Sequence, residues 1–192
     1  ILTRTRKEVV LIANTLSKEN IPFVSSESLS VSESKSVNFL ITLIRSILDP
    51  SDMLQRKEVL EFLWQLNFKK EDYQDLMFDN LDKDKSQSAF FKEINNIYGY
   101  SFNPEIFSKV SLYEAIEYAI KSFRLKSEID AYLMAFLDDV FEFSTNKNQN
   151  FAAYIFYWEE RGSEIIIPMP EGKNCVIINT IHKSKGLEFS NV

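Results

Sequence analysis

Most of the side chains that could do chemistry lie in one stretch near the end of the sequence, residues 180–189, which reads Thr-Ile-His-Lys-Ser-Lys-Gly-Leu-Glu-Phe. Four of them carry short donor groups that suit contacts with a phosphodiester backbone: Thr180, His182, Ser184 and Lys185. Gly186 lets the chain turn or approach a ligand closely, and Glu188 can accept a hydrogen bond from a sugar hydroxyl. A solvated strand-to-helix turn is the alternative for any one of these residues, but the ten together favour a ligand site.

A predicted strand positions this stretch. Residues 175–181 form an apolar, β-branched run, which is typical of a buried strand in a parallel sheet. The polar side chains would then stand at the carboxyl end of that strand. Open α/β sheets bind their ligands at this edge.

The start of the chain predicts a strand, a helix and a second strand within residues 1–25. Apolar residues at helical spacing predict the helix over 5–18, and residues 21–24 predict the second strand. Arg4 lies between the first strand and the helix. The N-terminal segment therefore resembles a βαβ unit.

The middle of the chain has helical periodicity almost throughout. Apolar stripes predict helices within 37–48, 59–66, 90–97, 111–123, 127–143 and 150–161. Ser111 and Glu114 have the spacing of a capping box, which marks a helix start. The serine-rich residues 25–34 predict a loop at a domain boundary, and residues 79–88 predict an exposed connection.

Two strand-containing ends therefore flank a long helical stretch, and the simplest fold is one sheet interrupted by a helical insertion. We predict a mainly α chain in three parts. They are an N-terminal α/β piece over 1–31, a helical insertion domain over 32–161 and a C-terminal α/β piece over 162–192.

The composition is that of an ordinary globular protein. Of 192 residues, 45% are hydrophobic and 26% charged, which excludes disorder over most of the chain. The net charge of −6 provides no global basic field for nucleic acid. The low glycine content, only 4 residues, also argues against a fold built on Gly-rich phosphate loops.

The single cysteine, Cys175, indicates a reducing compartment, and we expect a cytoplasmic protein. No apolar run approaches the ~20 residues that a membrane span needs. The N-terminus lacks the features of a signal peptide, and both ends of the sequence are abrupt. We therefore expect a piece of a longer protein.

Residues 179–189 resemble motif V of superfamily 1 DNA helicases of the UvrD/RecB/AddA type, with Asn179 in place of the usual Met. Residues 1–9, where a strand ends in Arg4, resemble motif IV of the same family, and Asn20-Ile21-Pro22-Phe23 resembles the strand that follows it. Residues 24–29 look more like the AddA/RecB exonuclease (exonuclease V) branch than the UvrD branch.

This resemblance implies a helical insertion framed by two pieces of a RecA-like second motor domain, the UvrD-like C-terminal domain of P-loop NTPase type. It implies an ATP-dependent DNA helicase that translocates 3′ to 5′ on single-stranded DNA, and unwinds duplex DNA, in recombinational repair. ATP and Mg²⁺ are the implied cofactors, and a second subunit of a helicase–nuclease complex is an implied partner.

The resemblance also implies residue roles. Arg4 would be catalytic, beside the γ-phosphate of ATP, where its permanent charge stabilises the transferred phosphoryl group. Gly186 and Glu188 would bind the nucleotide, with Glu188 on the ribose. Thr180, His182, Ser184 and Lys185 would contact DNA.

Several motifs of a complete motor are missing from the sequence. No Gly-x-x-x-x-Gly-Lys-Ser/Thr phosphate loop occurs, so this chain alone is predicted to hold no cofactor and to leave ATP unhydrolysed. The pair Asp138-Asp139 is predicted to lie on the solvent-exposed face of a helix rather than to bind Mg²⁺. No metal site is predicted.

Two alternatives stay open. The chain could be a non-catalytic helical module that binds protein partners, or the helical insertion itself could grip duplex DNA. Tyr98, Tyr100 and Phe102 could stack on bases but are predicted to belong to the core. Lys69-Lys70 and Arg124-Lys126 could touch phosphates or simply be solvated helix ends.

Overall fold

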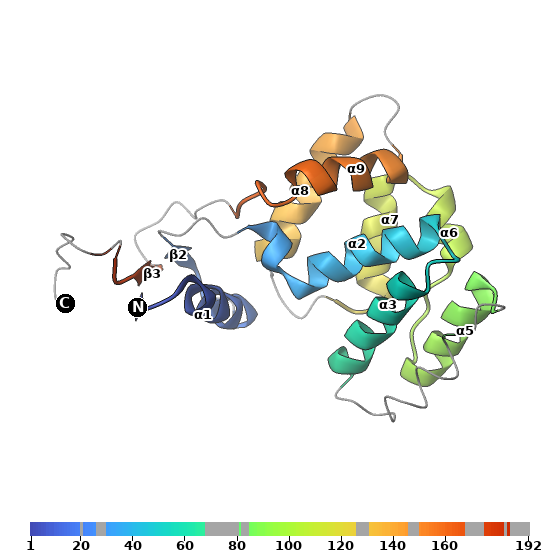
Figure 1. Cartoon of the computed structure of the whole chain (residues 1–192), viewed down its shortest axis with the longest axis horizontal. Coiled ribbons are helices and arrows are strands. Elements are labelled where there is room, and N and C mark those ends of the chain that lie inside the picture. Colours follow the sequence, from blue (N-terminus) through green and yellow to red (C-terminus); the bar gives the residue numbers. More distant parts are fainter. Residues whose placement is uncertain are drawn as a thin grey trace.

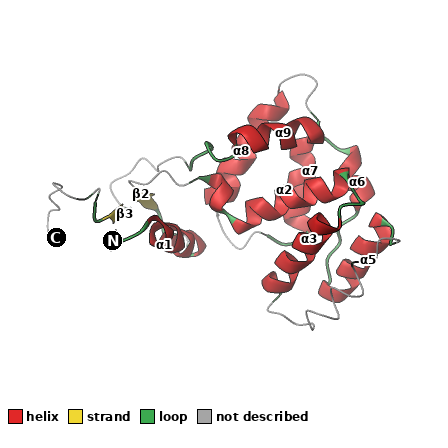
Figure 2. Cartoon of the chain, in the orientation of Figure 1, coloured by secondary structure: helices red, strands yellow, loops and turns green. Residues whose placement is uncertain are grey.

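A computed structural model describes residues 1–19, 21–25, 30–67, 81, 85–125, 131–145, 150–167, 175–182 and 184. Within these ranges the chain is mainly helical, as predicted, with a small parallel sheet (Figure 2). A small α/β part lies at one end of an elongated molecule, and the remaining helices form a larger part at the other end (Figure 1).

The α/β part contains three strands and one helix. They are β1 (Leu2–Thr3), α1 (Arg6–Lys18), β2 (Phe23–Ser25) and β3 (Val176–Thr180). The strand order is β1-β3-β2, and both pairings are parallel. Leu2 pairs with Asn179, and Phe23 pairs with Val176. The prediction that strands from the two ends of the chain join one sheet is confirmed.

One face of the sheet lies against α1. Val9 and Ala13 of α1 and Ile178 of the central strand are fully buried. The alternate strand residues point to the opposite face, where Leu2 is 57% exposed and Ile177 is 46% exposed. The α1 face therefore forms the core of this part.

The helical part begins with a short 3₁₀ turn, η1 (Val31–Glu33), within the stretch that was predicted as a loop. Its helices are α2 (Lys35–Leu48), α3 (Met53–Leu66), α5 (Gln87–Tyr98), α6 (Pro104–Lys109), α7 (Leu112–Ser122), α8 (Ala131–Thr145) and α9 (Phe151–Arg161). None of the helices in the described ranges has the length and apolarity needed to cross a membrane.

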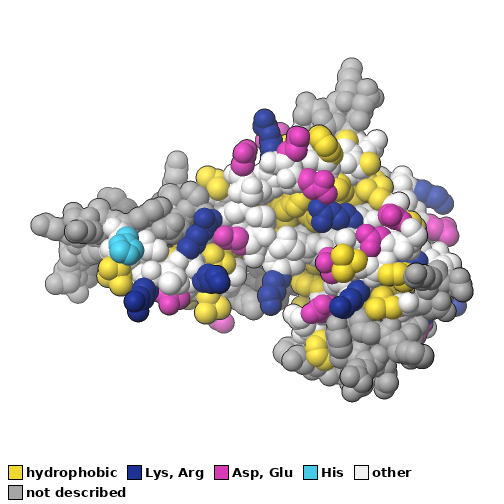
Figure 3. All heavy atoms as spheres, in the orientation of Figure 1, with side chains coloured by type: hydrophobic (Ala, Val, Ile, Leu, Met, Phe, Trp, Pro, Cys, Tyr) yellow, Lys and Arg dark blue, Asp and Glu magenta, His cyan; other side chains and the backbone are white. Residues whose placement is uncertain are grey.

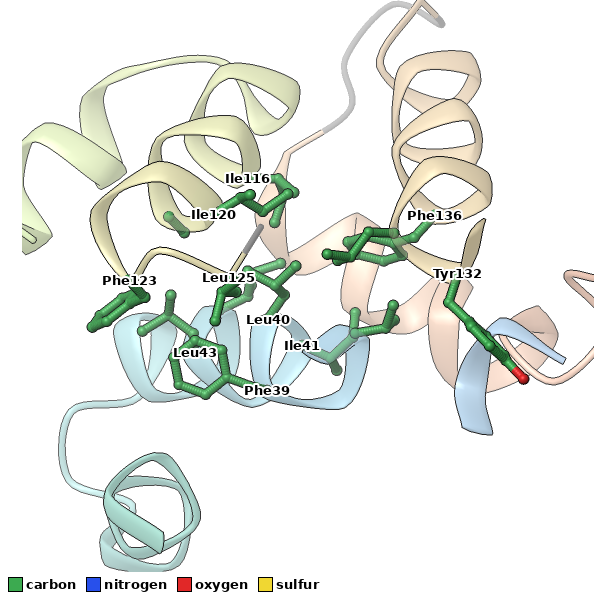
Figure 4. Packing of buried hydrophobic residues seen from close by; sticks show 14 of the residues in the cluster. Phe39, Leu40, Ile41, Leu43, Ile116, Ile120, Phe123, Leu125, Tyr132 and Phe136 are labelled. Atoms are coloured by element: carbon green, nitrogen blue, oxygen red, sulfur yellow. The ribbon is translucent and has the colours of Figure 1, made fainter. Parts of the chain in front are cut away.

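Helix α2 is the centre of this part. Figure 4 shows its side chains Leu40, Ile41 and Leu43 facing residues of α7 and α8, among them Ile120 and Phe136. Phe39 stacks on Phe62 of α3, with ring centroids 4.3 Å apart. Several other phenylalanines of this part are fully or nearly fully buried, among them Phe90, Phe91, Phe102 and Phe123.

Most helices begin at a side-chain cap. The caps are Ser34, Asp52, Ser86, Asn103, Ser111 and Asn150, each of which accepts a backbone N–H from the first turn. The capping box predicted at Ser111 and Glu114 is confirmed. Gly99, with φ +68°, ends α5 in the left-handed conformation that glycine adopts readily.

Three local predictions need correction. Residues 87 and 88 belong to α5 and not to a connection, because Ser86 caps that helix. Helix α6 was not predicted, because its six residues are too few to show an apolar stripe at helical spacing. Asn103 caps this helix, and Pro104 is its first residue. Helix α8 extends to Thr145, beyond the predicted end at residue 143.

Two chain segments join the α/β part to the helical part. Ser30 and Ile166 form an isolated antiparallel bridge, and the amide of Val31 donates to the carbonyl of Ile165 at 2.8 Å. The outgoing and returning segments therefore lie side by side where they enter the helical part.

Candidate functional site: the carboxyl edge of the sheet

The carboxyl ends of β1 and β3 lie next to each other. Thr3 pairs with Thr180, and the amide of Ile181 donates to the carbonyl of Thr3 at 2.9 Å. Arg4 follows β1 directly, and His182 comes two residues after β3. The parallel register thus brings Arg4 and His182 to the same edge, where both residues are exposed. Figure 3 shows the histidine (cyan) on the surface of the α/β part.

Hydroxyl groups lie just beneath this edge. Thr3 and Ser25 are buried at the ends of β1 and β2, and Thr180 is only 7% exposed. Thr3 Oγ1 donates to the carbonyl of Asn179 at 3.3 Å. Thr180 is therefore buried beneath the carboxyl edge, which we call the floor of the edge, while His182 is exposed at the surface of the edge.

The turn after β3 is held by its own hydrogen bonds. The amide of Ser184 donates to the carbonyl of Thr180 at 3.0 Å, and Ser184 Oγ donates to the carbonyl of Ile181 at 3.0 Å. These two bonds fold the chain back over the end of the strand. His182 is thereby presented from a bonded turn.

Glu8 fixes the segment that presents Arg4. Its Oε2 accepts the backbone N–H of Arg4 at 2.7 Å and that of Thr5 at 3.1 Å, and its own N–H donates to Thr5 Oγ1 at 3.4 Å. These bonds, first to Arg4 and then to Thr5, hold the pKa of the Glu8 carboxyl below its ordinary value. The amides of Arg4 and Thr5 at the start of α1 are thus satisfied internally.

The role of Glu8 was not predicted, although the sequence contains its signal. A threonine followed three residues later by a glutamate, just before an apolar helix, is the pattern of a capping box. Thr5 and Glu8 have this spacing. Glu8 therefore joins Arg4 in the candidate site as the residue that orders its backbone.

Other predicted site residues fall outside the described residues. They are Lys185, Gly186 and Glu188. The basic pair Lys69-Lys70 and Lys126 also lie there. The structure thus brings together Arg4, Thr180, His182 and Ser184, and it places none of the nucleotide-binding residues predicted after Ser184.

An exposed guanidinium and an imidazole at one edge, above buried hydroxyls, form an arrangement that suits an anionic ligand. Guanidinium keeps its charge at all physiological pH values and offers a planar set of donors to phosphate oxygens. Among the described residues, no group of three or more His, Cys, Asp or Glu is arranged to hold a metal ion. The described edge therefore presents hydrogen-bond donors of a kind that suits the oxygens of an anion.

The aromatic candidates belong to the core, as predicted. Tyr98 and Phe102 are buried, and the ring of Phe102 packs against Phe91 and Phe123 with centroids 4.7 and 4.8 Å away. Arg124 Nη2 donates to the carbonyl of Gly99 at 2.9 Å, so its guanidinium closes a loop of the helical part. These residues lie on other elements than the carboxyl edge.

The prediction for Asp138-Asp139 was wrong in one half. Asp138 is exposed, but Asp139 is half-buried and accepts hydrogen bonds from Tyr154 at 2.9 Å and Tyr157 at 2.7 Å. Burial raises the pKa of Asp139 above its ordinary value, although the two hydroxyl donors oppose this. The position faces α9, which periodicity within α8 alone does not reveal.

A separate hollow of about 610 Å³ lies mainly on α7. Its described lining includes Glu117, Lys121 and Arg124 from α7 and its C-terminal end, and Leu137 from α8. It contains none of the predicted residues of the carboxyl edge. The carboxyl edge and this hollow are therefore distinct features.

No protein-family model matches the chain, and no curated protein shows significant similarity to it.

Proposed function

We propose that the chain is a segment of an ATP-driven DNA motor, a helicase of the AddA/RecB-like type, in which the carboxyl edge meets nucleotide and DNA. The observation that carries the proposal is the parallel pairing of β1 with β3. This pairing brings Arg4 to the edge at which β3 ends, and β3 leads into residues 180–189, which carry the motif V resemblance. Anion recognition at such an edge is what a motor of this class requires.

In this proposal Arg4 acts on the γ-phosphate of ATP. An arginine in this role stabilises charge that develops on the transferred phosphoryl group. Glu8 keeps the Arg4 backbone in place, and Glu188 takes the ribose. In a complete motor, ATP and Mg²⁺ would be held mainly by a phosphate loop, a motif that the sequence here does not contain.

His182 and Ser184 take single-stranded DNA in the same proposal, with Lys185 beside them. The imidazole is exposed at the surface of the edge, where it can stack on a base or donate to a phosphate. Thr180, being nearly buried, contributes its hydroxyl from the floor of the edge. The motor would be cytoplasmic and act in recombinational repair, with a second subunit as partner.

Fluorescence anisotropy of a labelled oligothymidylate tests the DNA part of this proposal on the chain itself. We expect binding at low salt that weakens as salt rises, because phosphate contacts release counterions. Replacing His182 with Ala should weaken this binding about fivefold or more, since one stacked base is worth ~1–3 kcal/mol. Arg161→Ala, in the last turn of α9 and outside the carboxyl edge, is the control and should leave the affinity unchanged.

Two results would count against the proposal. Absence of oligothymidylate binding at low salt would favour the alternative of a non-catalytic helical module that binds protein partners. Binding that is unaffected by His182→Ala would place the DNA contact elsewhere. If a forked duplex bound while the single strand did not, the helical insertion would be the element that grips DNA.

A further inference from the structure

An ion pair joins α1 to the helical part of the chain. Arg6 Nη2 lies 3.2 Å from Glu33 Oε1. Arg6 is the first residue of α1, two positions after Arg4, and Glu33 is the last residue of η1. The other ion pairs among the described residues, such as Arg45–Glu159 and Lys109–Glu105, lie within the helical part. This pair therefore links the candidate site to the insertion.

Glu33 is well anchored on the helical side. Val31, at the start of η1, is fully buried, and Ser34 directly after Glu33 caps α2 by accepting the amide of Val37 at 3.4 Å. The amide of Glu33 itself donates to the carbonyl of Ser30 at 3.0 Å. The Glu33 carboxylate consequently moves with the start of α2, the central helix of that part.

The Glu33 carboxylate depends on Arg6. Its side chain is 27% exposed, and its Oε2 atom is buried with no hydrogen-bond partner among the described residues. The Arg6 side chain is 54% exposed, and it is the ion-pair partner that the described residues provide for the Glu33 carboxylate. Removing Arg6 leaves the partly buried Glu33 carboxylate without its ion-pair partner, which is costly for a buried charge.

On the other side, a hydrogen-bonded turn connects Arg6 to Arg4. The two residues flank Thr5, whose hydroxyl and amide both bond to Glu8. The same Glu8 carboxylate holds the amide of Arg4. A displacement of Arg6 is therefore transmitted through one ordered turn to the residue at the carboxyl edge.

We propose that Glu33 is a positioning residue: through Arg6 it holds the first turn of α1, and with it Arg4, in a fixed relation to the helical insertion. A rearrangement of η1 and α2 then changes the order of the segment that presents Arg4. The consequence for ATP turnover rests on the proposed function of Arg4, but the mechanical link does not.

Amide hydrogen exchange on this chain, followed by NMR, tests the link. In Glu33→Gln the amides of Arg4 and Thr5 should exchange about two- to fivefold faster, as expected for loss of an ion pair that solvent reaches on the Arg6 side. Arg6→Gln should have a larger effect. High salt should bring the wild-type rates close to those of Glu33→Gln. Glu160→Gln, an exposed glutamate in α9, is the matched control and should change nothing at these amides.

A charge exchange completes the test. The double variant Arg6→Glu with Glu33→Arg should restore slow exchange at Arg4 and Thr5, because it rebuilds the pair with reversed polarity. Unchanged rates in Glu33→Gln, or a double variant no better than the single ones, would overturn the proposal. Both outcomes are independent of DNA or ATP binding, so a failure here is distinguishable from a failure of the proposed motor function.

Discussion

Replacing Tyr154 with Phe removes one of the two hydroxyl donors to the half-buried Asp139 carboxylate. Tyr154 is fully buried between α8 and α9, and its hydroxyl lies 2.9 Å from Asp139 Oδ2. A hydrogen bond to a charged group contributes about 1.5–3 kcal/mol. Since Tyr157 still donates to the other oxygen at 2.7 Å, we expect a loss near the lower end, about 1.5 kcal/mol at neutral pH.

The loss should depend on pH in a defined direction. Burial raises the folded-state pKa of Asp139, so the folded chain holds this proton more tightly than the unfolded chain does. The stability that protonation contributes is complete below the unfolded pKa and is lost as pH rises through the folded pKa. The two tyrosine donors lower that folded pKa, so Tyr154→Phe raises it further, and its cost grows with pH across this window. Both tyrosines stay protonated, because burial and the nearby carboxylate raise the pKa of Tyr157 to about 12 and raise that of Tyr154 as well.

Urea unfolding monitored by circular dichroism, at mildly acidic and at neutral pH, measures this difference. Tyr113→Phe is the matched control, because the Tyr113 hydroxyl donates at 3.3 Å to Glu117 at the surface, and it should cost little at either pH. Asp139→Asn should abolish most of the pH dependence of the Tyr154→Phe effect. An equal loss at both pH values, or an undiminished pH dependence when Tyr154→Phe is combined with Asp139→Asn, would refute the reasoning.

Two further predictions concern single positions. Gly162→Ala should destabilise the chain by about 1–3 kcal/mol, because a Cβ at this position would lie 2.6 Å from the Trp158 carbonyl oxygen. Gly99→Asn should cost much less, since asparagine tolerates the φ of +68° at that position. Thermal unfolding of the two variants checks that the Gly162 variant is the less stable one. Glu8→Gln should lower stability most at neutral pH and progressively less as pH falls through the depressed pKa of Glu8. The reason is that the protonated carboxyl of the parent chain already lacks the charge that its two amide donors favour. Equal losses of stability at all pH values would contradict this prediction.

Local patterns were sufficient to predict much of this fold. The capping box at Ser111 and the helix after Arg4 follow from residues within one or two turns, and the apolar run around Ile178 predicts its parallel strand directly. Helix α6 was missed because six residues carry no complete hydrophobic period. The capping residue Asn103 followed by Pro104 indicates the start of this helix better than the spacing of its apolar residues does.

Features that depend on distant segments were not predictable. Asp139 is half-buried because α9 packs against α8. Glu33 of η1 pairs with Arg6 at the start of α1, although the rest of α1 and β2 lie between them in the sequence. At the carboxyl edge, the prediction of one sheet formed from both ends of the chain places Arg4 and His182 at a common edge, but the burial of Thr180 follows from strand packing. Pairwise geometry of this kind leaves no trace in local periodicity.

In the proposed function, Arg4 at the carboxyl edge takes part in ATP hydrolysis that DNA stimulates. The measurement that tests it most directly is DNA-stimulated ATP turnover by a longer chain that carries the phosphate loop, compared between the parent protein, Arg4→Ala and the control Arg161→Ala. We predict a fall of about 10³-fold or more for Arg4→Ala, as for other arginines that contact a transferred phosphoryl group, and no change for the control. Unchanged turnover in Arg4→Ala, or turnover by residues 1–192 alone that Arg4→Ala abolishes, would contradict the account.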